Sequence, residues 1–191
     1  MNKLKTIHEH TLNENILPEN ANILDLGCRD FRFTNTFRDM NYNVYPVDID
    51  IFEGESYYRI GISDKDGRCS VNHVDGWPLV TSICDGDDIP MMTLKSFSEF
   101  VGVSHWDLIK MDVEGSEMGI LMNSKHPIAT QVSVEFHAHC TSQTKEQIDE
   151  CLAYLHKWYH IFNRDWRLAS DWKDGPNNYW DVLLISNRMH P

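Results

Sequence analysis

The sequence predicts an α/β protein with a doubly wound, mostly parallel sheet that ends in an antiparallel strand. Short apolar segments alternate with segments of helical periodicity along most of the 191-residue chain, as is typical of such a sheet. Near the end of the chain, two apolar segments at 161–168 and 179–186 follow each other without a helix between them. Two strands joined only by a loop pair in antiparallel orientation, so the last strand should run against the others.

The first half of the predicted sheet consists of three strands and one helix. Residues 21–27 form a short apolar segment that runs into Gly27, and a short helix is expected at 33–40. Further strands are expected at 43–47 and 57–62, and a turn rich in aspartate and glycine follows the second of them.

The second half continues the alternation after an irregular segment. Residues 68–92 contain Trp-Pro and an acidic Asp-Gly-Asp-Asp run, so loops are expected there. Thr144 with Gln147 resembles a capping box for a helix through Tyr159. The other expected elements are a helix at 93–100, a strand at 106–112, a helix at 115–122 and a strand at 131–136.

Length and composition indicate one domain at 1–191, in which 1–20 are an N-terminal extension. A hydrophobic content of 41% can form one core. No apolar run approaches the roughly 18 residues that cross a bilayer, and the first residues lack the apolar core of a signal peptide. A cytoplasmic protein is therefore expected.

Charge and cysteine content exclude several classes of protein. The chain has 17 Lys and Arg against 29 Asp and Glu, a formal net charge of −12, with no basic cluster. Nucleic-acid backbones and anionic membranes would be repelled, so neither is an expected partner. The five cysteines form no Cys-x-x-Cys pair, which argues against a disulfide framework or a zinc knuckle.

Two expected strands carry charges where a covered sheet should be apolar. Lys110 and Asp112 alternate with apolar residues on the fourth strand, and Glu135 and His137 do so on the fifth. Neighbouring strands lie about 4.8 Å apart, so the four side chains can gather at one edge of the sheet. They are the candidate catalytic residues, although a buried ion pair that only closes the sheet explains the same pattern.

The loop after the first strand argues against a dinucleotide cofactor. It has a single glycine, Gly27, whereas a bound pyrophosphate prefers Gly-x-Gly-x-x-Gly, so a nucleotide-dependent oxidoreductase is disfavoured. S-adenosylmethionine carries no phosphate, and Asp25 can lie near its sulfonium and amino groups. Asp48 follows the second strand, where a carboxylate can hold both ribose hydroxyls. The candidate cofactor-binding residues, each of which can also be an ordinary turn residue, are Asp25, Gly27, Cys28, Arg29, Asp48, Ile49, Ser63 and Asp64, the last two near the adenine.

The segment Asp-Leu-Ile-Lys-Met-Asp-Val-Glu-Gly-Ser-Glu at 107–117, followed by Val-Glu-Phe-His at 134–137, resembles the FkbM family of S-adenosylmethionine-dependent methyltransferases. The resemblance extends to Ile-Leu-Asp-Leu-Gly at 23–27 and Val-Tyr-Pro-Val-Asp at 44–48. It implies a Rossmann-like, class I methyltransferase fold and O-methylation of a hydroxyl on a sugar or small metabolite. The acceptor would be a small molecule or glycan, and a second subunit of a homo-oligomer could complete its site.

Methyl transfer to a hydroxyl needs alignment and removal of a proton. His137 is the expected base because its reference pKa of about 6.5 is near working pH, and Asp112 and Glu135 can orient or assist it. Lys110 is expected to stay charged beside these carboxylates. No metal site is predicted, although Asp112, Glu135 and His137 form a set that Mg²⁺ or Ca²⁺ could bind.

The chain departs from the family pattern after the first strand, where Cys28-Arg29-Asp30-Phe31 replaces Ala-Asn-x-Gly. Phe31 is expected to remove the freedom of a glycine to adopt positive φ and to add bulk near the methionine moiety. A methyltransferase-like domain that binds without turnover is therefore the alternative function. Acceptor contacts are expected from loops at 84–92, 137–143 and 171–178.

Overall fold

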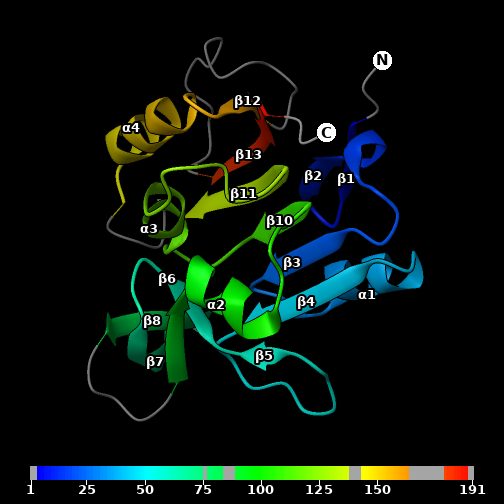
Figure 1. The fold of residues 1–191 in the computed structure, drawn as a ribbon. Coiled ribbons are helices and arrows are strands. Elements are labelled where there is room, and N and C mark those ends of the chain that lie inside the picture. Colours follow the sequence, from blue (N-terminus) through cyan, green and yellow to red (C-terminus); the bar gives the residue numbers. More distant parts are fainter. Residues whose placement is uncertain (1–3, 75–76, 84–88, 138–142, 164–178, 189–191) are drawn as a thin grey trace.

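The computed structural model describes residues 4–74, 77–83, 89–137, 143–163 and 179–188. Its centre is a seven-stranded sheet in which the strands lie in the order β12, β13, β11, β10, β3, β4 and β5 (Figure 1). The strands are β3 (Asn22–Leu26), β4 (Asn43–Asp48), β5 (Tyr58–Arg59), β10 (Leu108–Met111), β11 (Gln131–His137), β12 (Tyr159–Asn163) and β13 (Tyr179–Ser186). The strands from β5 to β11 are parallel, and β13 is antiparallel to both of its neighbours. The predicted α/β class and mostly parallel sheet are confirmed, and the C-terminal strand is antiparallel as predicted.

The order of the strands reverses between β3 and β10. The chain runs outward from β3 through β4 to β5 and then returns to place β10 on the other side of β3. Parallel strands end at the same edge of a sheet, so the ends of β3, β4, β10 and β11 lie together there. Ligands of open α/β sheets bind at such a reversal point.

Four helices accompany the sheet in the described part of the chain (Figure 1). They are α1 (Arg32–Asp39), α2 (Leu94–Val101), α3 (Glu117–Met122) and α4 (Lys145–Leu155), and a short 3-10 helix, η1, covers Glu14–Ile16. The capping box of Thr144 and Gln147 is confirmed at the start of α4. That helix ends at Leu155 rather than at Tyr159, because Tyr159 begins β12 and its hydroxyl accepts a hydrogen bond from Ile128 N at 2.7 Å. None of the described helices is long and apolar enough to cross a membrane.

The prediction of loops at 68–92 is wrong over most of that segment. A second sheet, in the order β6, β9, β7 and β8, includes it. Its strands are β6 (Gly61–Ser63), β7 (Gly67–Val74), β8 (Trp77–Ile83) and β9 (Ile89–Thr93). Pro78 and Pro90 each take the second position of a strand, β8 and β9, where a proline is tolerated near a strand end. Valine, threonine and isoleucine favour pairing within these strands. Residues 84–88 lie outside the described residues.

The N-terminal extension packs onto the main sheet. Strands β1 (Leu4–Ile7) and β2 (His10–Asn13) form an antiparallel hairpin, and every residue of β2 is buried. Thr11 N donates to Ser133 Oγ at 3.0 Å, and Asn13 N donates to Gln131 Oε1 at 2.9 Å. These contacts with β11 bring His10 to the edge of the sheet where the charged residues gather.

Candidate active site

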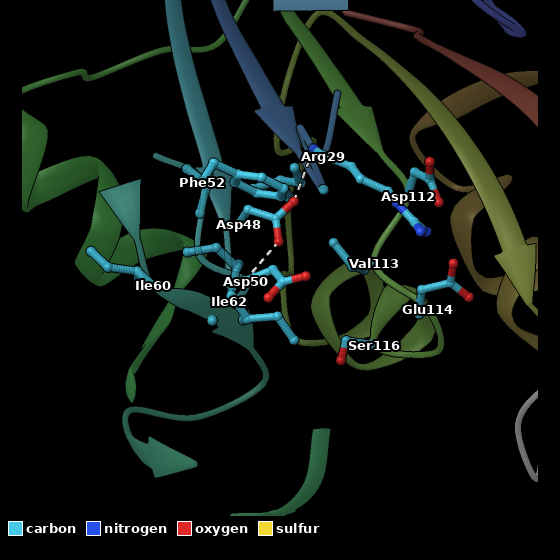
Figure 2. A pocket seen from close by; sticks show the side chains of 15 residues that line it. Arg29, Asp48, Asp50, Phe52, Ile60, Ile62, Asp112, Val113, Glu114 and Ser116 are labelled. Carbon is cyan, nitrogen blue, oxygen red and sulfur yellow. Dashed lines mark hydrogen bonds between the residues drawn. The ribbon is translucent and has the colours of Figure 1, made fainter. Parts of the chain in front are cut away.

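A cavity opens where β3, β4 and β10 end (Figure 2). Its empty volume is about 710 Å³, which includes space open to solvent. It is lined by Leu26, Gly27, Arg29, Val47, Asp48, Ile49, Asp50, Phe52, Ile60, Gly61, Ile62, Asp112, Val113, Glu114 and Ser116. Apolar side chains and carboxylates therefore share one hollow, so a ligand with both apolar and polar groups can be held there.

Gly27 allows two strands to approach each other at the cavity. It adopts φ of +75°, and a Cβ atom at this position would lie 1.8 Å from the backbone oxygen of Asp112. Gly27 N also donates to Val47 O at 2.9 Å. Only glycine meets both the positive φ and the close contact.

Asp48 is held in a fixed orientation on the wall of the cavity. Its Oδ2 accepts from Arg29 N at 3.0 Å and its Oδ1 accepts from Asp50 N at 2.9 Å, as Figure 2 shows. Burial raises the pKa of Asp48, and these backbone N–H groups oppose the shift. Each carboxylate oxygen keeps lone pairs for a ligand, because an ionised carboxylate offers about four acceptor sites.

Phe31 adopts a positive φ. A phenylalanine at this position was expected to prevent that backbone conformation, because it lacks the freedom of a glycine. Its φ is 58°, its ring packs edge-on against Phe52 and Tyr57 at centroid distances of 5.4 and 5.8 Å, and it does not line the cavity. The expectation that Phe31 abolishes this backbone conformation is wrong, because a buried aromatic cluster offsets a left-handed strain of about 1–2 kcal/mol. The substitution therefore leaves the cavity open.

Asp25 and Lys110 form a buried ion pair next to the cavity. Asp25 Oδ1 lies 3.4 Å from Lys110 Nζ, and Thr34 Oγ1 donates to Asp25 Oδ2 at 2.5 Å. Lys110 Nζ also donates to Gly27 O and, at 3.2 Å, to Leu26 O. Burial lowers the pKa of Lys110, but the charges of Asp25 and Asp112 outweigh it and raise the pKa above its ordinary value. Lys110 is thus a fixed cation, and Asp25 does not line the cavity.

His137 lies among four carboxylates at the end of β11. Its side chain is only 4% exposed, and Nδ1 donates to Glu117 Oε1 at 2.7 Å. Its Nε2 lies 3.4 Å from Asp112, 3.6 Å from Glu114 and 3.9 Å from Glu135. Burial lowers the pKa of His137, but Glu117, then Glu114 and Asp112, raise it to about 9. In these surroundings His137 holds a proton at neutral pH instead of accepting one, which differs from the behaviour expected of a free imidazole.

The two carboxylates beside His137 differ in their surroundings. Burial raises the pKa of Asp112, but contact with His10 and the charge of Lys110 hold it well below its usual range. Burial, followed by repulsion from Asp112, raises the pKa of Glu135 to about 7. Asp112 is therefore a weak base, whereas Glu135 binds a proton more readily.

A segment in the middle of the chain is similar to a known protein family. Residues 81–162 match the model of the methyltransferase FkbM domain. The predicted resemblance to the FkbM family is confirmed. The matched segment includes Lys110, Asp112, Glu135 and His137, and it supports a methyltransferase in general. A search of curated proteins found no match.

The remaining predicted cofactor residues lie in different places. Ile49 and Arg29 line the cavity, and Figure 2 shows the Arg29 side chain reaching towards Asp112. Cys28 is buried beside them, and burial raises the pKa of its thiol. Ser63 and Asp64 line other hollows, and Ser63 Oγ donates to Asp64 Oδ1 at 3.1 Å. The structure therefore brings together Gly27, Arg29, Asp48, Ile49 and Asp112, but not Asp25, Ser63 or Asp64.

Sequence reasoning missed three site residues. Glu117, which lies in the expected helix at 115–122, is completely buried and holds His137. Glu114 lines the cavity, and His10 reaches Asp112 from the N-terminal hairpin. The Asp-Val-Glu-Gly-Ser-Glu run carried a signal for the two glutamates, because it places three carboxylates within six residues. No pattern in the sequence marked His10.

Proposed function

We propose that this protein is an S-adenosylmethionine-dependent O-methyltransferase with a class I fold, acting on a hydroxyl of a sugar or small metabolite. The observation that carries the proposal is the position of Asp48, at the end of the second parallel strand and on the wall of a cavity that also reaches Asp112. The strand order and the antiparallel β13 support the class I assignment. The FkbM match supports methyl as the group that is transferred.

The cofactor would lie along the cavity from Asp48 to Asp112. Asp48 would accept hydrogen bonds from both ribose hydroxyls, because its two oxygens are already oriented by backbone N–H groups. Ile60 and Ile62 offer an apolar wall for the adenine, in place of the predicted contacts with Ser63 and Asp64. The sulfonium would then lie near Gly27 and Asp112, where carboxylates favour positive charge.

The transfer would be an in-line displacement. S-adenosylmethionine would supply the methyl group to a lone pair of the acceptor oxygen, and its sulfur would keep the electrons of the broken carbon–sulfur bond. The hydroxyl proton would pass to Glu135, whose side chain is 19% exposed and can reach an acceptor from outside. His137, the base expected from the sequence, would orient Asp112 and Glu135, and Lys110 would hold Asp112 in place.

Calorimetry with S-adenosylmethionine tests this proposal. Asp48→Asn should weaken cofactor binding about 10- to 100-fold, because hydrogen bonds to a charged group contribute about 1.5–3 kcal/mol. Asp64→Asn is the matched control and should bind like the wild type, since Asp64 does not line the cavity. An absence of binding by folded wild-type protein would refute the enzyme assignment, and binding of NAD(H) instead would indicate an oxidoreductase.

A further inference from the structure

We propose that Asp112, Glu114 and His137 bind one divalent transition-metal ion at the edge of the cavity. His137 Nε2 lies 3.4 Å from Asp112 Oδ1 and 3.6 Å from Glu114 Oε2, and all three ligand atoms lie within 4.8 Å of one another. Atoms held about 2.1 Å from one ion at tetrahedral or octahedral angles lie roughly 3.0–3.5 Å apart. The two distances from His137 Nε2 therefore lie at or just above this range, and a bound ion would draw the three ligand atoms closer together.

The imidazole of His137 is oriented as a metal ligand requires. Its Nδ1 donates to Glu117 Oε1, which also accepts from Gly115 N at 3.0 Å and Val113 N at 3.4 Å. Protein metal sites hold histidine ligands through a carboxylate in this way. The ion would displace the proton that Nε2 carries at neutral pH, the proton would leave to solvent, and the freed lone pair would point at the ion. Glu117 is thus a positioning residue, and Nε2 faces Asp112 and Glu114.

Contacts to Oδ2 fix the orientation of the Asp112 carboxylate. Its Oδ2 faces Lys110 Nζ at 3.5 Å and His10 Nε2 at 3.9 Å, whereas Oδ1 faces His137. His10 is itself held by Ser133 Oγ, 3.4 Å from its Nδ1. Two fixed groups on one side of the carboxylate therefore leave Oδ1 directed at the position of the ion.

The buried negative charge around this position favours a bound cation. Glu117 is fully buried, and its Oε2 has no hydrogen-bond partner among the described residues. Glu135 adds a further carboxylate 3.9 Å from His137 Nε2. Buried carboxylates are stable when they are paired or coordinate a metal. A divalent ion bound to Asp112, Glu114 and His137 would offset part of this negative charge.

The ligands favour a first-row transition metal over the hard cations considered from the sequence. Mg²⁺ and Ca²⁺ prefer oxygen ligands alone, whereas Mn²⁺, Fe²⁺ and Zn²⁺ accept an imidazole together with carboxylates. The proposed ligands also differ from those considered from the sequence, because Glu114, which lines the cavity, takes the place of Glu135. Since the geometry involves neither cofactor nor acceptor, the metal site does not depend on the proposed methyl transfer.

Electron paramagnetic resonance with Mn²⁺ tests the site on the full chain, stripped with a chelator and free of S-adenosylmethionine. We expect one bound ion per chain and a ¹⁴N coupling from His137 in the pulsed spectrum. His137→Ala should abolish this coupling and weaken binding at least tenfold, whereas His156→Ala, on the exposed end of α4, should change neither. Glu117→Gln should weaken binding about 10- to 100-fold with the coupling retained.

Glu114→Gln keeps the test decisive if a buried variant fails to fold, because the Glu114 side chain is 21% exposed. It should weaken Mn²⁺ binding while the circular dichroism spectrum stays unchanged. Mn²⁺ that remains free at millimolar concentration, or binding that is equal in wild type and Glu114→Gln, would overturn the proposal. Calorimetry with S-adenosylmethionine is independent of these outcomes, so failure of one proposal is distinguishable from failure of the other.

Discussion

Replacing Lys110 by methionine should lower the free energy of unfolding by about 3–5 kcal/mol, the cost of leaving a buried charge without its partner. Asp25 is fully buried, its Oδ1 has no hydrogen-bond partner among the described residues, and Lys110 Nζ lies 3.4 Å from it. Methionine keeps the length and packing of the side chain but not its charge. Urea unfolding followed by circular dichroism measures the loss.

Two further variants separate charge from packing in this prediction. Lys5→Met removes an exposed ion pair with Glu14 and should cost about 0–1 kcal/mol. The double variant Lys110→Met with Asp25→Asn removes both charges, so it should recover part of the loss, with a coupling energy of about 0.5–3 kcal/mol. Equal losses for Lys110→Met and Lys5→Met would show that the Asp25–Lys110 pair contributes nothing beyond a surface contact.

Gly27→Ala should be the second severe substitution, with an expected loss of about 3–5 kcal/mol from backbone strain and overlap together. The added methyl would lie 1.8 Å from the backbone oxygen of Asp112, so β3 and β10 must separate at the cavity. Because that movement shifts Asp112, binding of S-adenosylmethionine and of Mn²⁺ should both weaken. Urea unfolding measures the loss of stability, calorimetry measures the binding of S-adenosylmethionine, and electron paramagnetic resonance measures the binding of Mn²⁺.

Gly102→Ala is a matched control for this effect. Gly102 has φ of +74°, almost the same as Gly27, but among the described residues no non-adjacent atom lies within 4 Å of the position that an added Cβ would take. The control therefore carries the left-handed strain of about 1–2 kcal/mol without the overlap. If the two variants lose the same stability and Gly27→Ala binds its ligands normally, the close approach of β3 and β10 has no role in holding the site.

Local chemistry explains which elements were predictable. The capping box at Thr144 uses residues three positions apart, and the strands at the centre of the sheet are short apolar runs bounded by turns. The antiparallel β13 was predictable because the sequence shows no helical pattern between the last two apolar segments. The strands within 68–92 were not predicted, because glycine, proline and aspartate in this segment indicated turns. These strands are stabilised by pairing with one another, which the sequence of the segment does not show.

The sequence by itself determined the α/β class, the charged ends of β10 and β11 and the resemblance to the FkbM family, because each depends on residues close together in the chain. Only the tertiary structure decided how the charges are shared. Lys110 pairs with Asp25 from β3, His10 arrives from the N-terminal hairpin, and Glu117 turns back to hold His137. The charge state of each group depends on burial and on neighbours within about 4 Å, and those neighbours come from segments that only folding brings together.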